Sequence, residues 1–576
     1  MSIERFKRQL GLVYQERVED VRVLVYGTNP IVPYLVMQLA FLGTGFSQGG
    51  IFVYSEEASV EKEHVRGQFL LKEEDIGRRY EEAIVSRISE AVPSAKAYVC
   101  DKLEPHRYDI VMMCPAVGEA SKIDHNRVVY GYIGSSAAYI GSKPVEVVFE
   151  ENIITPSLAT TAASLMAQEM LRVLELIRPT EVEEVHITVN YRLRRPGIYE
   201  DVFRREQKPI FRALIGGERF RAFPEEVKEG GRALKDEVFF RVLIDPNSLL
   251  SRLIVDSIEI IEPIPAEYRR PKEQILVAPF MNAKIEEGTL VEEKVGLPKT
   301  LEVSKKLAFV GAGGVGCWAL AALAVSPISG LDLVIVDMDD RVEMHNLNRQ
   351  VLYGVEHIGR PKAIVAAEAV KQINPVIKCK GYCTEVREAV IIDFIEEEKQ
   401  EEAEVFEEEF EEASLPELKI VDESYDMMSD LKESDYIVTS VDNLHTRYLL
   451  SIISELTGSV FINAGAERFL GNIDVIDHSR GCLVCWYGED IKYDMQRISC
   501  TGELPILSIV TTVSLIGALQ TLILLAHLTG IKMTLHSLYY SGKTNNISYC
   551  AREKCPFHRE LPSHPQHLNL ANYKIW

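Results

Sequence analysis

The residues with the clearest chemical potential lie past the middle of the 576-residue chain, in the stretch FVGAGGVGCW at 309–318. Gly311, Gly313, Gly314 and Gly316 follow the apolar run LAFV, which predicts a strand, and precede CWALAALAV, which predicts a helix. Such glycines permit a tight turn and close approach of a phosphate, and a helix N-terminus offers N–H groups to an anion. The stretch therefore predicts a nucleotide site.

A carboxylate stands at the distance expected for ribose recognition. Asp337 ends the predicted strand LVIVD and follows Gly316 by 21 residues. An acidic residue at about this spacing accepts hydrogen bonds from ribose hydroxyls. Because NAD, FAD and ATP all carry an adenosine, this pair alone leaves the nucleotide open.

Cationic and amide side chains follow the second strand and narrow the choice to ATP. They are Asn346, Arg349, Gln350 and Lys362, in HNLNRQ and GRPKA, and Asp442 comes after the predicted strand DYIVTSVD. A triphosphate that loses pyrophosphate needs cations to neutralise the leaving group, whereas a dinucleotide does not. Asp442 is placed to hold Mg²⁺ on the phosphates. Singly, the cations would be surface charges and Asp442 a helix cap.

Two close cysteine pairs predict a metal site. They are CLVC, with Cys482 and Cys485, and CAREKC, with Cys550 and Cys555. Four thiolates suit tetrahedral Zn²⁺, and a site with no open position would be structural. The alternative is four unpaired buried thiols.

The chain contains an internal repeat. QFLLKEEDIGRRYEEAIVSRISEAVPSAK, from Gln68, resembles QVLYGVEHIGRPKAIVAAEAVKQINPVIK, from Gln350, at an offset of 282 residues. At the same offset the first copy lacks the chemical groups of the second, with Ser55 for Asp337, His64 for Asn346, Gly67 for Arg349 and Tyr80 for Lys362. If the second copy handles a nucleotide, the first cannot do so in the same way.

Alternating short apolar strands and helices predict an α/β fold in each copy. We expect a first domain at 1–180, a β-rich or mixed module at 181–290 and a second domain at 291–576, with an acidic insertion at about 385–430. The insertion includes EEEKQEEAEVFEEEFEE, which has eleven Glu and one Lys and predicts a solvated surface or lid.

Composition limits the partners and the location. The net charge of −23 argues against a nucleic-acid binder or a protein of anionic membranes. The N-terminus MSIERFKRQL lacks the apolar core of a signal peptide, so we expect a cytoplasmic protein. Residues 504–531 contain no charged side chain apart from histidine, but Pro, Ser, Thr and Gln interrupt them, which favours a helix buried between domains over a membrane span.

These motifs together resemble the ubiquitin-activating-enzyme superfamily, which includes the sulfur-carrier adenylyltransferases MoeB and ThiF. They are GAGGVG, Asp337, NLNRQ, GRPK, SVDN with Asn443 and Arg447, and the cysteine pairs; the similarity is strong over about 300–560 and weak over 1–180. The resemblance implies two Rossmann-like ThiF-type units, one inactive and one active, that form a pseudo-dimer within one chain. It also implies that Asp337 binds the ribose, that Asn346, Arg349, Gln350 and Lys362 bind the phosphates, that Asp442 binds magnesium and that the four cysteines bind zinc.

The same resemblance suggests roles for two more residues. Arg8, in RFKRQLGL, matches an arginine that family members send across a dimer to the partner's ATP, although it could also be a plain surface arginine. Cys500, in RISCTGELP, lies where many members carry a cysteine that takes the activated protein as a thioester, with Arg497 nearby to favour the thiolate. A structural cysteine, or the remnant of one in an enzyme that stops at the adenylate, is the alternative.

The leading hypothesis is an ATP- and Mg²⁺-dependent enzyme that adenylates the C-terminal glycine of a ubiquitin-like or sulfur-carrier protein ending in Gly-Gly. Transfer to Cys500, and onward to a conjugating or sulfur-transfer protein, would be later steps. Alternatives are adenylation of a peptide precursor or another acceptor, a scaffold that binds a ubiquitin-like protein without turnover, and, remotely, an NAD-linked oxidoreductase. ATP–pyrophosphate exchange separates most of these.

Overall fold

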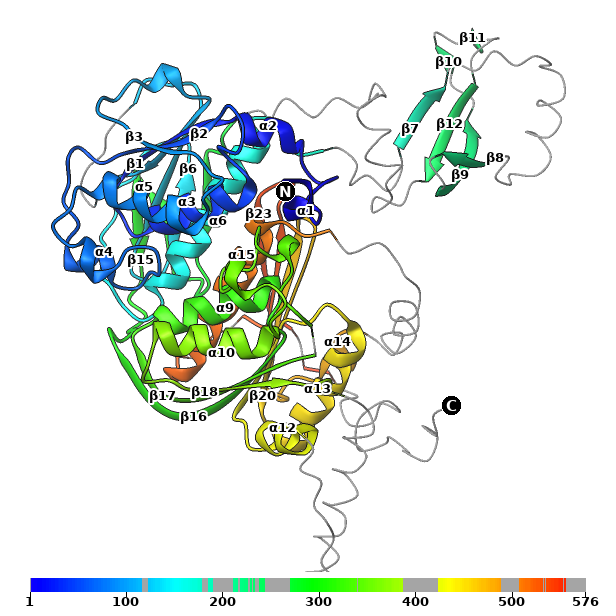
Figure 1. The fold of residues 1–576 in the computed structure, drawn as a ribbon. Helices are drawn as coiled ribbons and strands as arrows, with labels where there is room; N and C mark the ends of the chain where they lie inside the picture. Colours follow the sequence, from blue (N-terminus) through cyan, green and yellow to red (C-terminus); the bar gives the residue numbers. More distant parts are fainter. Residues whose placement is uncertain are drawn as a thin grey trace, which may run out of the picture.

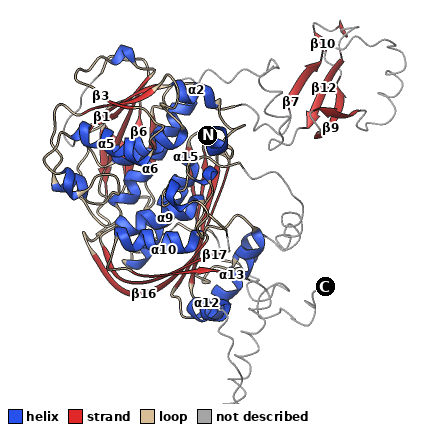
Figure 2. Ribbon diagram, in the orientation of Figure 1, coloured by secondary structure: helices blue, strands red, loops and turns tan. Residues whose placement is uncertain are grey.

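The protein is described by a computed structural model (Figure 1). It covers residues 2–116, 123–178, 270–338, 340–386, 423–487, 507–531, 533, 535–552 and 554–555, with isolated strands between 185 and 243. We call residues 2–178 the first half and residues 301–555 the second half. Each half is built of strands and helices around its own sheet, as Figure 2 shows, so the predicted α/β class is confirmed.

The first sheet has seven strands. Their order is β3 (Ala97–Val99), β2 (Gly50–Tyr54), β1 (Arg22–Gly27), β4 (Ile110–Cys114), β5 (Val128–Ile133), β6 (Ala138–Gly141) and β13 (Gln274–Val277). The first five run parallel, whereas β6 and β13 are antiparallel additions. Strand β13 comes from the range predicted for the middle module, so the end of that range contributes to the first sheet.

The second sheet has eight strands in a matching arrangement. Their order is β18 (Lys378–Cys383), β17 (Ile328–Asp337), β16 (Leu301–Val310), β19 (Tyr436–Thr439), β20 (Val460–Glu467), β21 (Leu470–Ile476), β22 (Ser537–Ser541) and β23 (Asn546–Cys550). Again five strands are parallel, and the remainder are antiparallel. The central parallel strands β16, β17, β19 and β20 contain apolar runs, as expected where helices cover both faces of a sheet.

Local backbone contacts recur at the offset of the sequence repeat. Lys362 N–H donates to Asp340 O at 3.0 Å, and 282 residues earlier Tyr80 N–H donates to Ala58 O at 2.8 Å. Helix α10 (Lys362–Ile373) and helix α5 (Tyr80–Ala91) begin at these equivalent residues. The two halves therefore share strand order and loop geometry, and their chemical differences lie in side chains.

Three buried helices separate the two sheets: α6 (Thr155–Val173), α9 (Gly314–Val325) and α15 (Val510–Leu528), as Figure 1 shows. Helix α15 packs against both α6 and α9. A helix that is apolar on all sides is stable only where all sides are covered. Among the described residues α15 is the one helix long and apolar enough to cross a membrane, but 94% of its apolar window is buried inside the protein. The predicted burial of this segment is confirmed.

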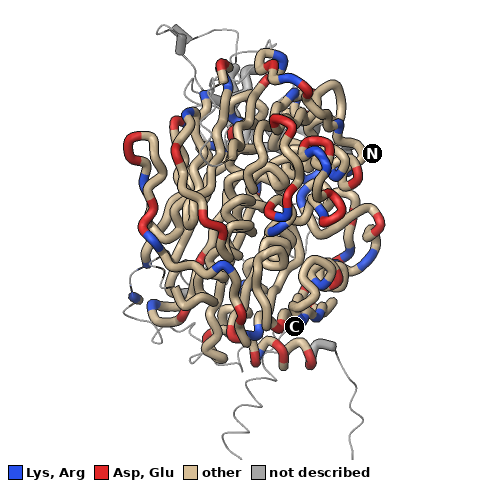
Figure 3. Tube along the Cα trace, turned by 90° about the vertical axis from the view of Figure 1, so that its left-hand side faces the viewer, with Lys and Arg blue, Asp and Glu red and all other residues tan. Residues whose placement is uncertain are grey.

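Four of the described strands of the middle module form an antiparallel sheet, and β10 (Lys228–Glu229) pairs separately with β11 (Arg232–Ala233). The order of the four-stranded sheet is β7 (Val185–Val189), β12 (Val238–Leu243), β9 (Glu218–Glu225) and β8 (Phe211–Ile215). Residues 387–422, which include the acidic run of the predicted insertion, lie outside the described residues, and helix α12 (Glu423–Lys432) follows them. Along the rest of the chain, acidic and basic positions are interspersed (Figure 3).

Candidate functional site

A cavity of about 1110 Å³ opens at the carboxyl ends of the parallel strands of the second sheet. Ligands of open α/β sheets bind at this edge. The predicted residues Arg8, Gly311, Gly313, Gly314, Asp337, Asn346, Arg349, Gln350, Lys362, Asp442, Asn443 and Arg447 all line it. The structure thus brings together side chains from positions 8 to 447 of the chain. Gly316 is not part of the lining, and Cys500 lies outside the described residues.

The glycine loop leaves open space at the N-terminus of α9. Gly311 has φ +100° and an added Cβ would lie 2.8 Å from the Ser440 carbonyl carbon, so the turn requires glycine there. An added Cβ on Gly316 would lie 1.9 Å from Gly311 O, which assigns Gly316 to packing within the turn. A Cβ on Gly313 would meet nothing within 4 Å. An anionic group can therefore approach the loop at Gly313 and the first N–H groups of α9.

Asp337 lies at the end of β17, beside the glycine loop. Its Oδ2 accepts a hydrogen bond from Ala312 N–H at 2.5 Å, which fixes the carboxylate next to the turn. Burial raises the pKa of Asp337 to about 7, although the Ala312 N–H and the Lys362 ammonium both act to lower it. The carboxylate is thus held in a site that disfavours its charge, as expected where a ligand replaces solvent.

Three cations line the same cavity. Arg349 is 5% exposed, and burial lowers its pKa to about 9, an effect that nearby Arg8 strengthens. Lys362 is the first residue of α10 and donates to Asp340. Burial also lowers the pKa of Arg8, and these cations add to the burial that lowers the pKa of His345 to about 3. Clustered, partly desolvated cations of this kind are stabilised by an anion.

The neighbouring amides have different surroundings. Asn346 Oδ1 accepts from Glu343 N–H at 2.8 Å and so closes the short 3-10 helix η5 (Met344–Asn346). Gln350 is 3% exposed, and its Oε1 has no hydrogen bond to the described residues. Asn346 therefore shapes the loop, whereas the Gln350 carbonyl oxygen is available to a ligand donor.

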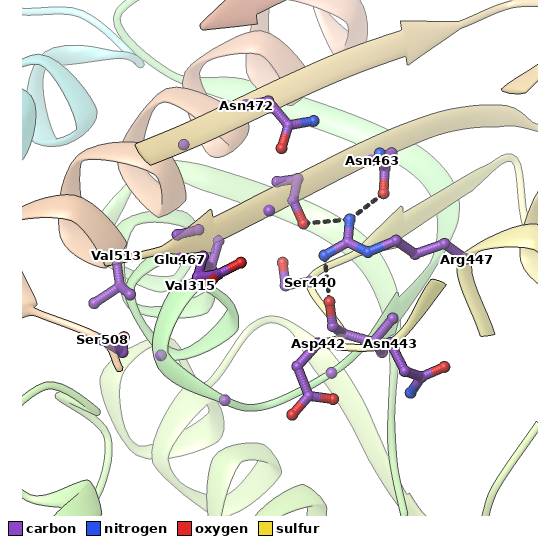
Figure 4. A pocket seen from close by; sticks show the side chains of 18 of the residues that line it. Val315, Ser440, Asp442, Asn443, Arg447, Asn463, Glu467, Asn472, Ser508 and Val513 are labelled. Carbon is purple, nitrogen blue, oxygen red and sulfur yellow. Dashed lines mark hydrogen bonds between the residues drawn. The ribbon is translucent and has the colours of Figure 1, made fainter. Parts of the chain in front are cut away.

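Asp442 lies on the loop after β19, and Figure 4 shows it close to Asn443 and to Arg447, whose hydrogen bonds are drawn. Asp442 is exposed to the cavity. Asn443, rather than Asp442, caps helix α13 (Leu444–Thr457), because its side chain accepts from Thr446 N–H at 2.8 Å. Arg447 is buried and donates to Val441 O, to Ala464 O at 2.7 Å and to Asn463 Oδ1. The contacts of Arg447 therefore position the loop that presents Asp442.

Sequence reasoning missed the polar residues behind Arg447. Asp474 is fully buried and accepts from Asn472 Nδ2 at 3.0 Å and from Ser537 Oγ at 2.7 Å. Asn463 Nδ2 also lies 3.4 Å from Asp474 Oδ2. The one available signal was the aspartate within the otherwise apolar run IDVI of β21, because a buried charge must be paired.

The N-terminal segment crosses from the first half to this cavity. Arg5 Nη2 donates to Leu347 O at 2.9 Å, and Asn348 Nδ2 donates to Gln9 Oε1 at 3.2 Å. Arg8 O accepts from Ser508 N–H at 2.8 Å. These contacts place the Arg8 side chain in the lining, beside the loop that carries Arg349.

The equivalent place in the first half is filled by the chain itself. The rings of His64 and Tyr80, at the positions of Asn346 and Lys362, lie edge to face with centroids 5.0 Å apart. In the turn after β1, Asn29 is buried, and its Nδ2 donates to Gly131 O at 3.0 Å. Aromatic rings and a satisfied amide thus occupy the place where the second half has cations and open space.

The predicted zinc ligands are only partly assembled. Cys482 Sγ and Cys485 Sγ are 3.8 Å apart, and Cys555 N–H donates to Arg480 O at 2.9 Å, which joins the second pair to the first. However, within the described part of the chain no group of three or more potential metal ligands is found. The structure therefore does not support the four-cysteine site, which stays a prediction.

Replacing Asp337 by Asn is expected to stabilise the protein at alkaline pH. The pKa of Asp337 is about 7 in the folded state against its ordinary value of 3.8, so the folded state binds more protons than the unfolded state in this range. The free energy of unfolding therefore falls as pH rises from about 4 to 7. Asparagine cannot ionise. We expect D337N to gain about 1–3 kcal/mol over wild type at pH 8 and little at pH 4, measured by thermal unfolding without nucleotide. An equal difference at both pH values would contradict this.

The ThiF family model matches residues 293–559. One similar curated protein is the adenylyltransferase and sulfurtransferase MOCS3 of Sus scrofa, which is 27% identical over 42% of this chain and 44% of that protein. Another is the sulfur carrier protein adenylyltransferase of Thermus thermophilus, which is 28% identical over 29% of this chain and 48% of that protein. The chain spans about half or less of the length of such relatives. A crystal structure of E. coli MccB with succinimide is similar over 44% of this chain and 65% of that one, at 18% identity, but its TM-score of 0.31 is too low to support an argument.

Proposed function

We propose that the chain, whose residues 293–559 match the ThiF family model, uses ATP to adenylate the C-terminal glycine of a small ubiquitin-like or sulfur-carrier protein. The substrate class is suggested by the names of the relatives, which include adenylyltransferases of sulfur carriers.

One observation carries the proposal: Asp337 and the cations Arg349 and Lys362 converge on one cavity at the N-terminus of α9. A ribose-binding carboxylate alone would fit a dinucleotide equally well. Buried cations beside it match a reaction in which negative charge develops on a leaving group.

Binding places the α-phosphate between the glycine loop and the cations. Asp337 accepts hydrogen bonds from the ribose hydroxyls, and the α-phosphate lies at the open face of Gly313, where the free N–H groups of α9 point. The β- and γ-phosphates lie toward Arg349, Lys362 and Arg8.

In the reaction, a carboxylate oxygen of the partner's C-terminus attacks the α-phosphorus of ATP. The bond between that phosphorus and the α–β bridging oxygen breaks, pyrophosphate leaves with the electron pair, and an acyl-adenylate remains. Arg349, Lys362 and Arg8 offset the charge that accumulates on pyrophosphate, because they are pre-positioned in the cavity, where Arg349 and Lys362 are buried.

Asp442 fits the role of a magnesium ligand. It is exposed to the cavity on a loop held by Arg447, and magnesium in nucleotide sites uses one or two carboxylates together with phosphate oxygens and water. When bound, the ion would supply positive charge to the phosphates.

The outer part of the cavity has room for the end of a polypeptide. Its lining continues over the antiparallel strands, through Leu470, Asn472, Tyr539, Ser541 and Ser548. The whole cavity exceeds the usual 300–1,000 Å³ of a small-molecule pocket. We place the partner's last residues there, with their carboxylate directed at the glycine loop.

The first half acts in this proposal as the inactive member of a pseudo-dimer. Supporting observations are its matching strand order, its filled nucleotide position and its delivery of Arg8 to the cavity. The proposal also retains a structural zinc ion at the four cysteines. The 3.8 Å between Cys482 and Cys485 suits two corners of a tetrahedron with Zn–S bonds of about 2.3 Å, and no catalytic step depends on this ion.

ATP–pyrophosphate exchange with a panel of small proteins ending in Gly-Gly tests adenylation. Wild type should exchange label with at least one of them, and Asp442→Ala should lower the rate. Tight binding of a panel member without exchange by any of them would support a scaffold instead. Exchange with a peptide precursor alone would replace the substrate class.

Thioester formation on Cys500 is a separate part of the proposal, and C500A tests it. We expect C500A to keep exchange within about twofold of wild type, because adenylation precedes the thiol's attack. We also expect it to lose the covalent adduct that an added thiol, but not a phosphine reductant, releases by thioester exchange. The adduct is measured on non-reducing gels with the carrier that supports exchange. An adduct that persists in C500A would assign it to another residue.

A further inference from the structure

The turn between β22 and β23 forms part of the outer wall of the cavity. Ser541, Thr544 and Asn546 line the cavity at this turn. Strand β23 is the last strand of the second sheet and pairs only with β22 among the described strands. An edge hairpin is held weakly by its own sheet, so the position of this wall depends on what else contacts the turn.

A helix of the first half holds the turn at both ends. Gln168 Nε2, on α6, donates to Gly542 O at 2.9 Å. Asn545 is fully buried in a left-handed conformation with φ +49°, and its Nδ2 donates to Leu165 O at 3.0 Å and to Glu169 Oε1 at 2.8 Å. The turn of one half is thus bonded to a helix of the other.

Glu169 is the centre of these contacts. It is 1% exposed and accepts from Arg172 Nε at 3.1 Å, from Arg172 Nη2 at 2.7 Å and from Lys272 N–H at 3.1 Å, besides Asn545. A buried ion pair rarely adds net stability, but removing one partner is costly because it leaves the other charge uncompensated. The four donors therefore hold the carboxylate in one place, and it in turn fixes the side chain of Asn545.

Lys272 adds a second link between this cluster and the turn. Its Nζ donates to Asn546 Oδ1, and its backbone N–H bonds to Glu169. Lys272 precedes β13, where the chain returns from the middle module to the first sheet. The cluster thus joins α6, the returning chain and the cavity wall.

We infer that Glu169 is a positioning residue for the partner-binding part of the cavity and acts through Asn545 on the β22–β23 turn. The inference rests on the proposed function for the identity of the partner. It goes beyond the delivery of Arg8, because it makes the first half a fixed support for the wall that the partner's C-terminus contacts.

Two variants and a control test this role. Asn545→Gly keeps a left-handed conformation available and removes the side-chain bonds to α6, together with the bond that Asn545 Oδ1 accepts from Tyr540 Oη at 3.0 Å within the hairpin. Asn545 itself does not line the cavity. Glu169→Gln replaces one acceptor oxygen with a donor. Asp75→Asn is the matched control, because Asp75 is a fully buried carboxylate of the first half that accepts from Arg87 Nε and Arg78 Nη1, both at 2.7 Å.

The result expected for N545G and E169Q is a KM for the carrier protein raised about tenfold, as for the loss of one or two hydrogen bonds. The KM for ATP should stay within twofold, and D75N should match wild type in both. A KM for ATP that rises as much as that for the carrier, or a carrier KM that does not change in N545G, would overturn the inference. E169Q can fail to fold because Arg172 loses its charged partner. In that case the KM of N545G for the carrier protein alone tests the inference.

Hydrogen exchange separates this inference from the proposed function. Amides of 541–549 should exchange faster in N545G than in wild type, with no change at the glycine loop, whatever the partner is. If no carrier supports ATP–pyrophosphate exchange, the proposed function fails. Hydrogen exchange at 541–549 still tests whether α6 holds the β22–β23 turn. Unchanged exchange at 541–549 would remove the positioning role.

Discussion

Lys362→Ala is expected to lower the rate of ATP–pyrophosphate exchange by about 10²–10³-fold, since the loss of one pre-positioned group that stabilises developing charge has this order of effect. Lys362 is buried, begins α10 and lies in the cavity with Arg349 and Asp337. Its present partner is Asp340, so its ammonium is already held in place before the nucleotide arrives. Exchange rates measured over a range of ATP concentrations up to saturation would separate a loss of rate from a loss of affinity.

Arg360→Ala is the matched control for that experiment. Arg360 is two residues earlier, and it pairs on the surface with Glu368 at 2.8 Å, with exposed side chains on both sides. A surface pair of this kind contributes little, so R360A should exchange at the wild-type rate. If K362A and R360A behaved alike, the cation would have no special place in the reaction, and the choice of ATP over a dinucleotide would lose its main support.

The repeat in the sequence predicted much of the fold, because a loop is formed by residues that are close in the chain. Two similar local sequences therefore form similar loops. The match between IGRRY and IGRPK corresponds to equal backbone bonds, with Gly77 N–H donating to Val60 O and Gly359 N–H to Val342 O. Local motifs also placed the cavity lining, since strand ends of a parallel sheet meet at one edge. Spacing along the chain could not separate Gly316, which packs within the turn, from Gly313, which faces open space.

Contacts between distant segments were beyond sequence reasoning. Glu169 and Asn545 are 376 residues apart, and a glutamate in the helical pattern ASLMAQEMLRVL looks like an ordinary polar position until α6 is seen to be buried on all sides. Asp474 behind Arg447 is a similar case. In both cases the informative feature is the burial of a charged side chain. The residue pattern within one helix or strand cannot show which other elements pack against it, so this burial could not be predicted from the sequence.

Arg8→Ala is expected to lower exchange by about 10²-fold, as for the loss of one group that stabilises the departing pyrophosphate. The backbone contacts of the segment, from Ser508 N–H to Arg8 O, remain available to alanine, so the fold should persist. Burial lowers the pKa of Arg8, whereas the nearby carboxylates of Asp442, Glu343 and Asp340 act to raise it, so the Arg8 guanidinium lies close to Asp442, the proposed magnesium ligand. Lys7→Ala is the control, because Lys7 is about half exposed, does not line the cavity and forms a long surface ion pair with exposed Glu4 at 4.0 Å.

Mixing two inactive variants tests whether Arg8 serves the cavity of its own chain. In this structure Arg8 and Lys362 line the same cavity of one molecule, so a mixture of R8A and K362A should stay inactive. In a symmetric dimer that exchanged its N-terminal segments, a hybrid would contain one cavity with both cations, and up to about a quarter of the sites in a random mixture would recover. Recovered exchange would therefore assign Arg8 to a second chain, and wild-type activity in R8A alone would exclude it from the reaction. Persistent inactivity with an unchanged thermal midpoint is the result that the geometry of the single chain predicts.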